Sequence, residues 1–397
     1  MNKGIKSAEI FGEIQAIPSK SYAHRISICN FLAGNPPKAD CNGFSSADIL
    51  VTENCLKTLA NGGKELDCGE SGSTLRFLIP LCAVMGGDYS FIGHGKLMER
   101  PNAELFSVLN EHGVKTSQTD SIKISGKLTG GEFHIRGDIS SQYISGLLMA
   151  LPYLNADSKI VLTTPLVSAP YVDITLEVLS SFGVMIEKTE YGFSINGGQK
   201  YSGNIVPEGD WSNAAFFLAL GGITGKVAVK GLNINSVQGD RFITEILRLA
   251  GAKVTFKENS VTASANKLEG FSFDAENCPD LVPVSAAIAA FADGKTVIKN
   301  IQRLKIKESD RIATTIATLS AFGIRAESDG KDLVVYGGKP VGCKVNSFND
   351  HRIAMSAAVL GAGAVGDTFI TDAQAVNKSY PTFFEDFCKV GGITYDI

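Results

Sequence analysis

The stretch "LEVLSSFGVMIEK", residues 176–188, contains an amphipathic helix pattern, a glycine and an alternating strand pattern. Apolar residues recur at helical spacing as far as Phe182, and from Val184 onward they alternate as in a half-buried strand. Gly183 stands directly after the helix pattern, where the backbone of a helix C-terminus needs a positive φ. The stretch therefore predicts a helix, a tight turn and a strand that packs back on the helix.

The same pattern occurs six times along the chain. Its glycines stand at positions 62, 113, 183, 251, 323 and 391, separated by 51, 70, 68, 72 and 68 residues. Further helix patterns rich in small residues lie between the copies, such as "SSQYISGLLMALPYL" (140–154) and "PVSAAIAAFADG" (283–294). Internal repeats of this kind indicate a modular fold, in which each unit holds about two helices and several strands.

Six copies predict an α+β fold of two similar domains with three copies each, the small-residue helices being buried at the centre of each domain. A chain of 397 residues is also too long for one ordinary core. The boundaries are expected near Pro18 and within 204–217. Residues 1–18 and 209–397 then form one domain, which includes the strand pattern "SAEIFGEIQAIP", and residues 19–208 form the inserted domain.

The composition excludes several classes of protein. The formal charge is −4, from 37 basic and 41 acidic residues, so we expect no nucleic-acid partner. Neither a signal peptide nor an apolar span of membrane length is evident, which predicts a cytoplasmic protein with no membrane partner. The eight cysteines and five histidines are scattered without the spacing of metal ligands, so no metal site is expected.

Basic side chains recur at predicted helix starts, although a helix N-terminus already carries a partial positive charge. A single such residue is usually a solvated surface charge. Six such starts together favour a cleft in which helix N-termini and cationic side chains converge on a polyanionic ligand. The basic residues at these starts are Lys20, Arg25, Arg76, Arg100, Lys307, Arg311, Arg352 and Lys378.

Polar uncharged residues stand at other helix starts. Ser140, Ser141 and Gln142 open one predicted helix, and Ser168 opens another. Short hydroxyl side chains at such positions cap helices by accepting amide hydrogen bonds. Clustered with cations, they also suit the binding of phosphate oxygens.

Two acids among these cations are candidates for proton transfer. Glu308 lies beside Arg311, and Asp280 follows "ENCP" just before a buried helix. A carboxylate weakens anion binding in a cationic cleft, so its presence there favours a role in the chemistry. For Glu308 a salt bridge with Lys305 or Arg311 is the alternative. Asp350, next to a predicted helix start, is expected to be a cap.

Taken together, the motifs resemble the enolpyruvyl transferases over essentially the whole chain. The motifs, in the order and spacing of that family, are "IPSKSYAHR", "GESGSTLRFL", "MERP", "SSQY", "SAPYVDITL", "KIKESDRI", "NDHRIAM" and "NKSYPTFF". The resemblance is strongest to the members that use shikimate 3-phosphate. It implies two domains, each of three βαβαββ units, with the active-site cleft between them. It also implies a monomer that transfers the enolpyruvyl group of phosphoenolpyruvate to the 5-hydroxyl of shikimate 3-phosphate, without metal or organic cofactor.

The resemblance also implies the roles of individual residues. Asp280 is then the base for the 5-hydroxyl, Glu308 the acid that protonates the methylene carbon, and Lys20 the group that assists the departing phosphate. Shikimate 3-phosphate would be bound by Lys20, Ser21, Arg25, Ser140, Ser141, Gln142, Ser168, Asp280 and Lys307. Phosphoenolpyruvate would be bound by Lys20, Gly72, Arg100, Gln142, Arg311, Arg352 and Lys378.

Two alternatives and one open residue remain at this point. The related transferase that uses UDP-N-acetylglucosamine has Lys-Asn in place of "SKS" and usually a reactive Cys or Asp on a mobile loop, whereas the loop "GHGKLMERP" (93–101) has no Cys. A non-catalytic anion-binding protein on the same fold would not need both Glu308 and Asp280. His24 shares a helix face with Lys20, and both a packing role and a supporting role are open.

Overall fold

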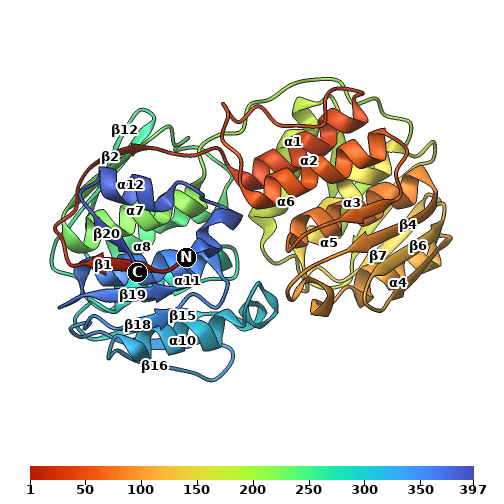
Figure 1. Cartoon of the computed structure of the whole chain (residues 1–397). Helices are drawn as coiled ribbons and strands as arrows, with labels where there is room; N and C mark the ends of the chain where they lie inside the picture. Colours follow the sequence, from red (N-terminus) through yellow and green to blue (C-terminus); the bar gives the residue numbers. More distant parts are fainter. The chain divides into compact units, whose positions relative to one another are not determined.

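The computed structural model describes residues 1–397 and contains two compact units. Residues 20–207 form one unit, here called the inserted unit. Residues 1–19 and 208–397 form the other, here called the C-terminal unit. Figure 1 shows the red N-terminal strands among the green and blue elements of the C-terminal unit.

The inserted unit contains six α-helices and eight strands. The helices are α1 (Lys20–Leu32), α2 (Ala47–Ala60), α3 (Gly72–Met85), α4 (Ala103–Glu111), α5 (Ser141–Ala150) and α6 (Ala169–Ser181). The strands are β3 (Glu65–Asp67), β4 (Gly87–Ile92), β5 (Val114–Gln118), β6 (Ile122–Gly126), β7 (Gly131–Ile135), β8 (Ser158–Leu162), β9 (Ile186–Thr189) and β10 (Gly192–Ile195). The 3₁₀ turns are η1 (Leu97–Glu99) and η2 (Leu151–Tyr153).

The C-terminal unit contains the remaining elements. Its helices are α7 (Trp211–Thr224), α8 (Ile243–Leu249), α9 (Val282–Ala289), α10 (Arg311–Ala321), α11 (His351–Gly363) and α12 (Phe383–Lys389). Its strands are β1 (Lys3–Lys6), β2 (Phe11–Gln15), β11 (Lys226–Lys230), β12 (Lys253–Lys257), β13 (Ser260–Ser264), β14 (Ser272–Asp274), β15 (Lys295–Lys299), β16 (Arg325–Ser328), β17 (Leu333–Tyr336), β18 (Lys344–Asn346), β19 (Thr368–Thr371) and β20 (Ile393–Asp396). Its 3₁₀ turns are η3 (Gly239–Phe242), η4 (Pro279–Leu281), η5 (Gln302–Ile306) and η6 (Ala373–Lys378).

Five four-stranded sheets share one topology, which confirms the predicted α+β fold of repeated units. One example is the sheet ordered β7-β8-β10-β9, in which β7 and β8 are parallel. The strands β9 and β10 form a hairpin, and β10 pairs antiparallel with β8. The first two strands are joined by one helix, and the second helix leads into the hairpin. The segment with α1 and α2 has the two helices of a copy but no strand, so the sheets number five rather than six.

Two copies of the C-terminal unit are completed by the N-terminal strands. β2 pairs in parallel with β11, although the inserted unit separates β2 from its helix α7 in the sequence. β1 lies between β19 and β20 in another sheet and is antiparallel to both. The four residues of β1 were not predicted as a strand, because so short a segment shows no periodic pattern.

The first helix of each copy is buried on all sides, as predicted for the small-residue helices. Every residue of α9 is buried, and α11 packs against both α7 and α9. In the inserted unit α3 packs against α5. Gly146 allows that approach, because a Cβ there would lie 2.6 Å from the carbonyl oxygen of Arg76. The second helices, such as α10, bury one face only and cover these central helices.

The glycines that define the repeat have the expected backbone conformation. All six have φ between 74° and 98°. At Gly183 the amide bonds to the carbonyl of Ser180, and the amide of Val184 bonds to that of Leu179. These bonds terminate α6 and turn the chain into β9. No helix in either unit combines the length and the apolar character needed to span a bilayer.

Candidate active site

In the inserted unit most of the predicted site residues lie at or near helix N-termini. Lys20 is the first residue of α1, and Ser21 follows it. The ammonium of Lys20 lies 2.7 Å from Oδ2 of Asp48, in the first turn of α2. Both side chains are largely buried. The cation at the start of α1 is therefore held by an acid of the neighbouring helix, which the sequence pattern did not reveal.

Gly72 and the guanidinium of Arg100 lie together at the start of α3. Ser71 caps the helix by accepting a hydrogen bond from the amide of Thr74, whereas the amides of Gly72 and Ser73 donate none. The side chain of Arg100 is 8% exposed, and its buried Nε has no hydrogen-bond partner. Free helix amides beside a buried cation are typical of sites for carboxylate or phosphate groups.

The side-chain amide of Gln142, on α5, makes two hydrogen bonds to α3. Its Oε1 accepts a hydrogen bond from Nη1 of Arg76 at 2.8 Å, and its Nε2 donates to Oγ of Ser73 at 3.0 Å. Arg76 also donates to the carbonyl oxygen of Pro101 at 3.0 Å. Arg76, on α3, therefore links this helix to the start of α5 and to the segment after η1. Its position at a helix start reflects this structural function.

Arg25 makes most of its hydrogen bonds within the protein. Its Nε donates to Oγ1 of Thr175 at 2.7 Å, and Nη1 donates to the carbonyl oxygen of Ser21 at 2.7 Å. Nη2 donates to the carbonyl oxygen of Tyr171 at 2.8 Å and to Oγ of Ser145 at 3.3 Å. Burial lowers the pKa of Arg25 to about 10, so the side chain remains charged near neutral pH. Four of its five N–H groups are engaged, which leaves one for a ligand.

The predicted hydroxyl ligands occupy helix starts, but in different ways. Ser140 is the N-cap of α5 and accepts a hydrogen bond from the amide of Gln142 at 3.3 Å. Ser141 is the first residue of that helix and is 7% exposed. Ser168 precedes α6 in a left-handed conformation, with φ of 54°, and its side chain does not cap the helix. The capping function expected for these serines is thus seen at Ser140.

In the C-terminal unit Asp280 lies among three cations. Its Oδ1 accepts a hydrogen bond from Nη1 of Arg311 at 2.8 Å, and its Oδ2 accepts one from Nη2 of Arg352 at 2.9 Å. The ammonium of Lys307 is 3.6 Å from Oδ1. The carboxylate thus joins η4 to the start of α10 and the start of α11.

Arg311 is surrounded by acids and is 1% exposed. Asp350 accepts from its Nε at 2.8 Å and from its Nη2 at 3.2 Å, while Nη2 also lies 2.6 Å from Oε2 of Glu308. Burial alone would lower the pKa of Arg311, but Asp350, Glu308 and Asp280 raise it above its ordinary value. Asp350 also caps α11 through the amide of Arg352, as predicted. Of the two partners expected for Glu308, the structure shows Arg311.

Two further cations complete the predicted set. Burial lowers the pKa of Lys307, and Asp280 opposes this shift. Lys378 ends η6, and its ammonium donates to the carbonyl oxygen of Asn349 at 2.6 Å. Asn349 and the preceding Phe348 both have positive φ, of 54° and 55°. This turn brings the chain into the N-cap of α11.

Acidic side chains balance the predicted cations of the C-terminal unit more closely than the sequence pattern suggested. The predicted cluster of cations is interleaved with Asp280, Glu308 and Asp350. Asp240, on η3, is a further acid that the sequence pattern did not indicate. Burial, followed by the charge of Asp280, raises the pKa of Asp240 to about 6, and Ser212 donates a hydrogen bond to its Oδ2. Acids and bases with shifted pKa values are concentrated in this way at catalytic sites.

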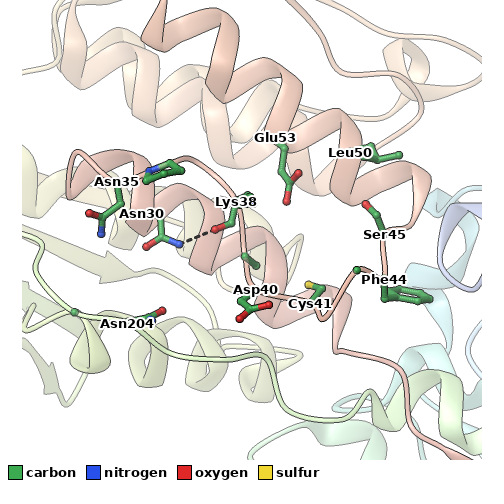
Figure 2. Close-up of a pocket in the computed structure, with 14 residues that line it drawn as sticks. Asn30, Asn35, Lys38, Asp40, Cys41, Phe44, Ser45, Leu50, Glu53 and Asn204 are labelled. Carbon is green, nitrogen blue, oxygen red and sulfur yellow. Dashed lines mark hydrogen bonds between the residues drawn. The ribbon is translucent and has the colours of Figure 1, made fainter.

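A separate cavity of about 680 Å³ lies in the inserted unit. It is bounded by the end of α1, the segment from Asn35 to Ser45, the start of α2 and the segment around Asn204. Figure 2 shows Glu53 and Cys41 in its wall, together with the hydrogen bond from Asn30 to the carbonyl oxygen of Lys38. None of the predicted site residues lines this cavity.

Comparisons with known proteins agree with the resemblance seen in the motifs. The family model described as EPSP synthase (3-phosphoshikimate 1-carboxyvinyltransferase) matches residues 59–387. A 3-phosphoshikimate 1-carboxyvinyltransferase of Clostridium kluyveri is 38% identical over 415 residues, 98% of this chain and 97% of the relative. Its counterpart in Clostridium novyi is 39% identical over 425 residues, 99% and 98% of the two chains.

Solved structures share the fold at lower identity. EPSP synthase of Acinetobacter baumannii superposes with a TM-score of 0.80 at 24% identity, covering 100% of both chains. The enolpyruvyl transferase NikO of Streptomyces tendae gives a TM-score of 0.79 at 17% identity, covering 99% of this chain and 98% of the other. At these identities the likeness bears on the fold alone. The family model and the curated relatives show that this chain belongs to the EPSP synthase family.

Proposed function

We propose that the protein transfers the enolpyruvyl group of phosphoenolpyruvate to the 5-hydroxyl of shikimate 3-phosphate, giving 5-enolpyruvylshikimate 3-phosphate and phosphate. Membership of the family and relatives named for this activity support the reaction. The single observation that carries the chemistry is Asp280, a carboxylate bonded to both Arg311 and Arg352. Anion binding alone does not need an acid in that position. A cytoplasmic monomer is the expected state.

Two anionic substrates account for the cationic residues of both units. We assign phosphoenolpyruvate to the amides after Ser71 and the side chain of Arg100, where a helix start and a buried guanidinium favour an anion. The further residues assigned to it are Lys20, Gln142, Arg311, Arg352 and Lys378. Shikimate 3-phosphate is assigned to Lys20, Ser21, Arg25, Ser140, Ser141, Gln142, Ser168, Asp280 and Lys307.

The proposed reaction is an addition followed by an elimination. Glu308 gives a proton to the methylene carbon of phosphoenolpyruvate while the 5-hydroxyl oxygen adds to C2 and loses its proton to Asp280. In the second step the methyl carbon returns a proton to the Glu308 carboxylate, the C–O bond to phosphate breaks and the enol ether forms. Asp280 passes the proton of the 5-hydroxyl to the departing phosphate. Lys20 stabilises the negative charge that develops on the departing phosphate. Atoms and charges balance without a further reactant.

The ion pairs of the C-terminal unit suggest how the acids are made available. Glu308 can donate a proton only when it is protonated, and its contact with Arg311 at 2.6 Å favours the carboxylate. An anionic substrate bound to Arg311 and Arg352 would compete with Glu308 and Asp280 for these guanidinium groups. Binding of phosphoenolpyruvate is therefore expected to weaken both ion pairs and so free the two acids for proton transfer.

The decisive measurement is phosphate release from phosphoenolpyruvate. Release should require shikimate 3-phosphate, and ³¹P NMR should show the new enolpyruvyl ether of that substrate. Release that depends on UDP-N-acetylglucosamine instead would assign the protein to the other branch of the enolpyruvyl transferases. Binding of phosphoenolpyruvate without release under any acceptor would contradict the catalytic proposal.

A further inference from the structure

A buried chain of hydrogen bonds crosses three helices of the inserted unit. Nδ1 of His24, on α1, lies 2.7 Å from Oγ1 of Thr52 on α2. Thr52 Oγ1 lies 2.5 Å from Oγ1 of Thr74 on α3, and that hydroxyl lies 2.7 Å from Oγ of Ser71. Ser71 is the residue that caps α3 and precedes Gly72. The chain therefore ends at the helix start assigned to phosphoenolpyruvate.

The four side chains are shielded from solvent. Thr52 and Thr74 are fully buried, and His24 and Ser71 are each 1% exposed. Burial, followed by the charges of Lys20 and Arg25, lowers the pKa of His24 well below its ordinary value. The imidazole is therefore neutral at neutral pH, and it carries its single proton on either Nδ1 or Nε2.

One order of protons satisfies the chain better than the reverse order. Nε2 of His24 is buried and has no hydrogen-bond partner. If Nε2 carried the proton, a buried N–H donor would be left without an acceptor, which is rare and costly. With the proton on Nδ1, His24 donates to Thr52, and Thr74 donates to Ser71. Thr52 has two acceptors for its hydroxyl proton, and Oγ1 of Thr74 at 2.5 Å is closer than the carbonyl oxygen of Asp48 at 3.3 Å. Ser71 then accepts from both the hydroxyl and the amide of Thr74.

The chain also runs beside the ion pair of Lys20. On α1, His24 lies one turn after Lys20, and on α2, Thr52 lies one turn after Asp48. The contacts Lys20–Asp48 and His24–Thr52 thus link the same two helices at successive turns. The second contact continues to α3, through Thr74.

We infer that His24 is a positioning residue for phosphoenolpyruvate: through Thr52 and Thr74 it fixes the Ser71 cap and thereby the direction of the free amides of Gly72 and Ser73. The inference rests on the proposed function and adds a residue that touches no substrate. A ring needed for packing alone could be replaced by an apolar side chain, since His24 packs edge-on against Phe77. An apolar side chain could not replace the hydrogen bond through which His24 links the three helices.

The test compares the Michaelis constants for the two substrates in full-length variants. His24→Leu and Thr52→Val break the chain, and both are expected to raise KM for phosphoenolpyruvate about 5- to 20-fold while KM for shikimate 3-phosphate stays within about twofold. His24→Asn is expected to restore KM to within about threefold, because its amide N–H can donate to Thr52. Ser27→Ala is the matched control, a buried polar residue of α1 outside the chain.

Three results would overturn the inference. One is an equal rise in both Michaelis constants, and another is an unchanged KM for phosphoenolpyruvate in Thr52→Val, the nearly isosteric variant that keeps the fold most closely. A third is an Nε2–H tautomer of His24 in a long-range ¹H–¹⁵N NMR spectrum. The Nδ1–H tautomer supports the chain whether or not the enzyme turns over, whereas absence of phosphate release by the wild type contradicts the proposed function alone.

Discussion

The guanidinium of Arg100 packs directly over Gly72, so closely that a Cβ on Gly72 would lie 2.4 Å from Nη1 of Arg100. Gly72 is the first residue of α3, and its amide has no intrahelical acceptor. A cation is unfavourable beside the positive end of a helix unless an anion lies between them. The pair therefore explains both the glycine in "GESGS" and the basic residue in "MERP".

Gly72→Ala is expected to raise KM for phosphoenolpyruvate about tenfold with little change in melting temperature. The added methyl group must displace Arg100 from the two free amides, whereas the backbone of Gly72 does not have a positive φ and accepts alanine. Steady-state kinetics and a thermal melt measure the two effects. Gly338→Ala is the control, because a Cβ there meets only Ile324, at 3.4 Å. An unchanged KM in Gly72→Ala would contradict the assignment.

Glu308→Gln is expected to lower kcat about 100-fold or more, the usual contribution of a general acid. The glutamine can still accept a hydrogen bond from Arg311 but cannot give a proton to the methylene carbon. Substrate binding should remain close to that of the wild type. Single-turnover kinetics and calorimetric titration with shikimate 3-phosphate separate the two quantities.

Glu327→Gln serves as the matched control for that variant. Glu327 also pairs with an arginine, Arg325, at 3.0 Å, but both side chains are exposed. Its loss of charge should leave kcat unchanged. If Glu308→Gln also turned over normally, Glu308 would be only a partner of Arg311 and the assignment of the acid would fail.

The sequence contains local signals for the fold. At the site it indicates one partner of most ion pairs, the basic residue, but not the acid that the basic residue contacts. The glycines after the helices and the small-residue helices predict the repeat, because helix termination and burial depend on neighbouring residues. The basic residues at helix starts are visible for the same reason. Their partners are not, since Asp48 reaches Lys20, and Asp350 reaches Arg311, only after distant segments pack together. Asp240 lies in a polar segment without any periodic pattern.

Asp240→Asn is expected to stabilise the protein above pH 6 and to have little effect near pH 4. The folded-state pKa of about 6 exceeds the ordinary value of 3.8, mainly because of burial. Between these values the folded state binds more protons than the unfolded state, so this group lowers the free energy of unfolding as the pH rises. Above pH 6 the penalty is constant and amounts to up to about 3 kcal/mol.

Urea denaturation of wild type and variant across pH 4 to 8 measures this difference. The free energy of unfolding of Asp240→Asn should exceed that of the wild type by an amount that grows from pH 4 to pH 6 and then levels off. The asparagine keeps an acceptor for Ser212. A difference that is constant over the whole range would show that Asp240 does not change its charge in this interval.

Asp350→Ala is expected to destabilise the protein far more than Asp310→Ala, although both aspartates are N-caps. Asp310 caps α10 by accepting from the amides of Ile312 and Ala313, and losing it should cost about 1 kcal/mol. Asp350 caps α11 but is also fully buried against Arg311. Its removal leaves a guanidinium that is 1% exposed without its main partner, which typically costs about 3–5 kcal/mol.

The comparison separates capping from charge pairing, because Asp350→Asn retains an oxygen for the cap and for Arg311 while it removes the charge. Its free energy of unfolding, measured in urea at pH 7, should fall between those of the wild type and Asp350→Ala. Equal losses in Asp350→Ala and Asp310→Ala would mean that Asp280 and Glu308 alone suffice to hold Arg311. In that case Asp350 would act only as a cap. The position of the buried Arg311 would then be fixed by Asp280 and Glu308, the two acids assigned to proton transfer.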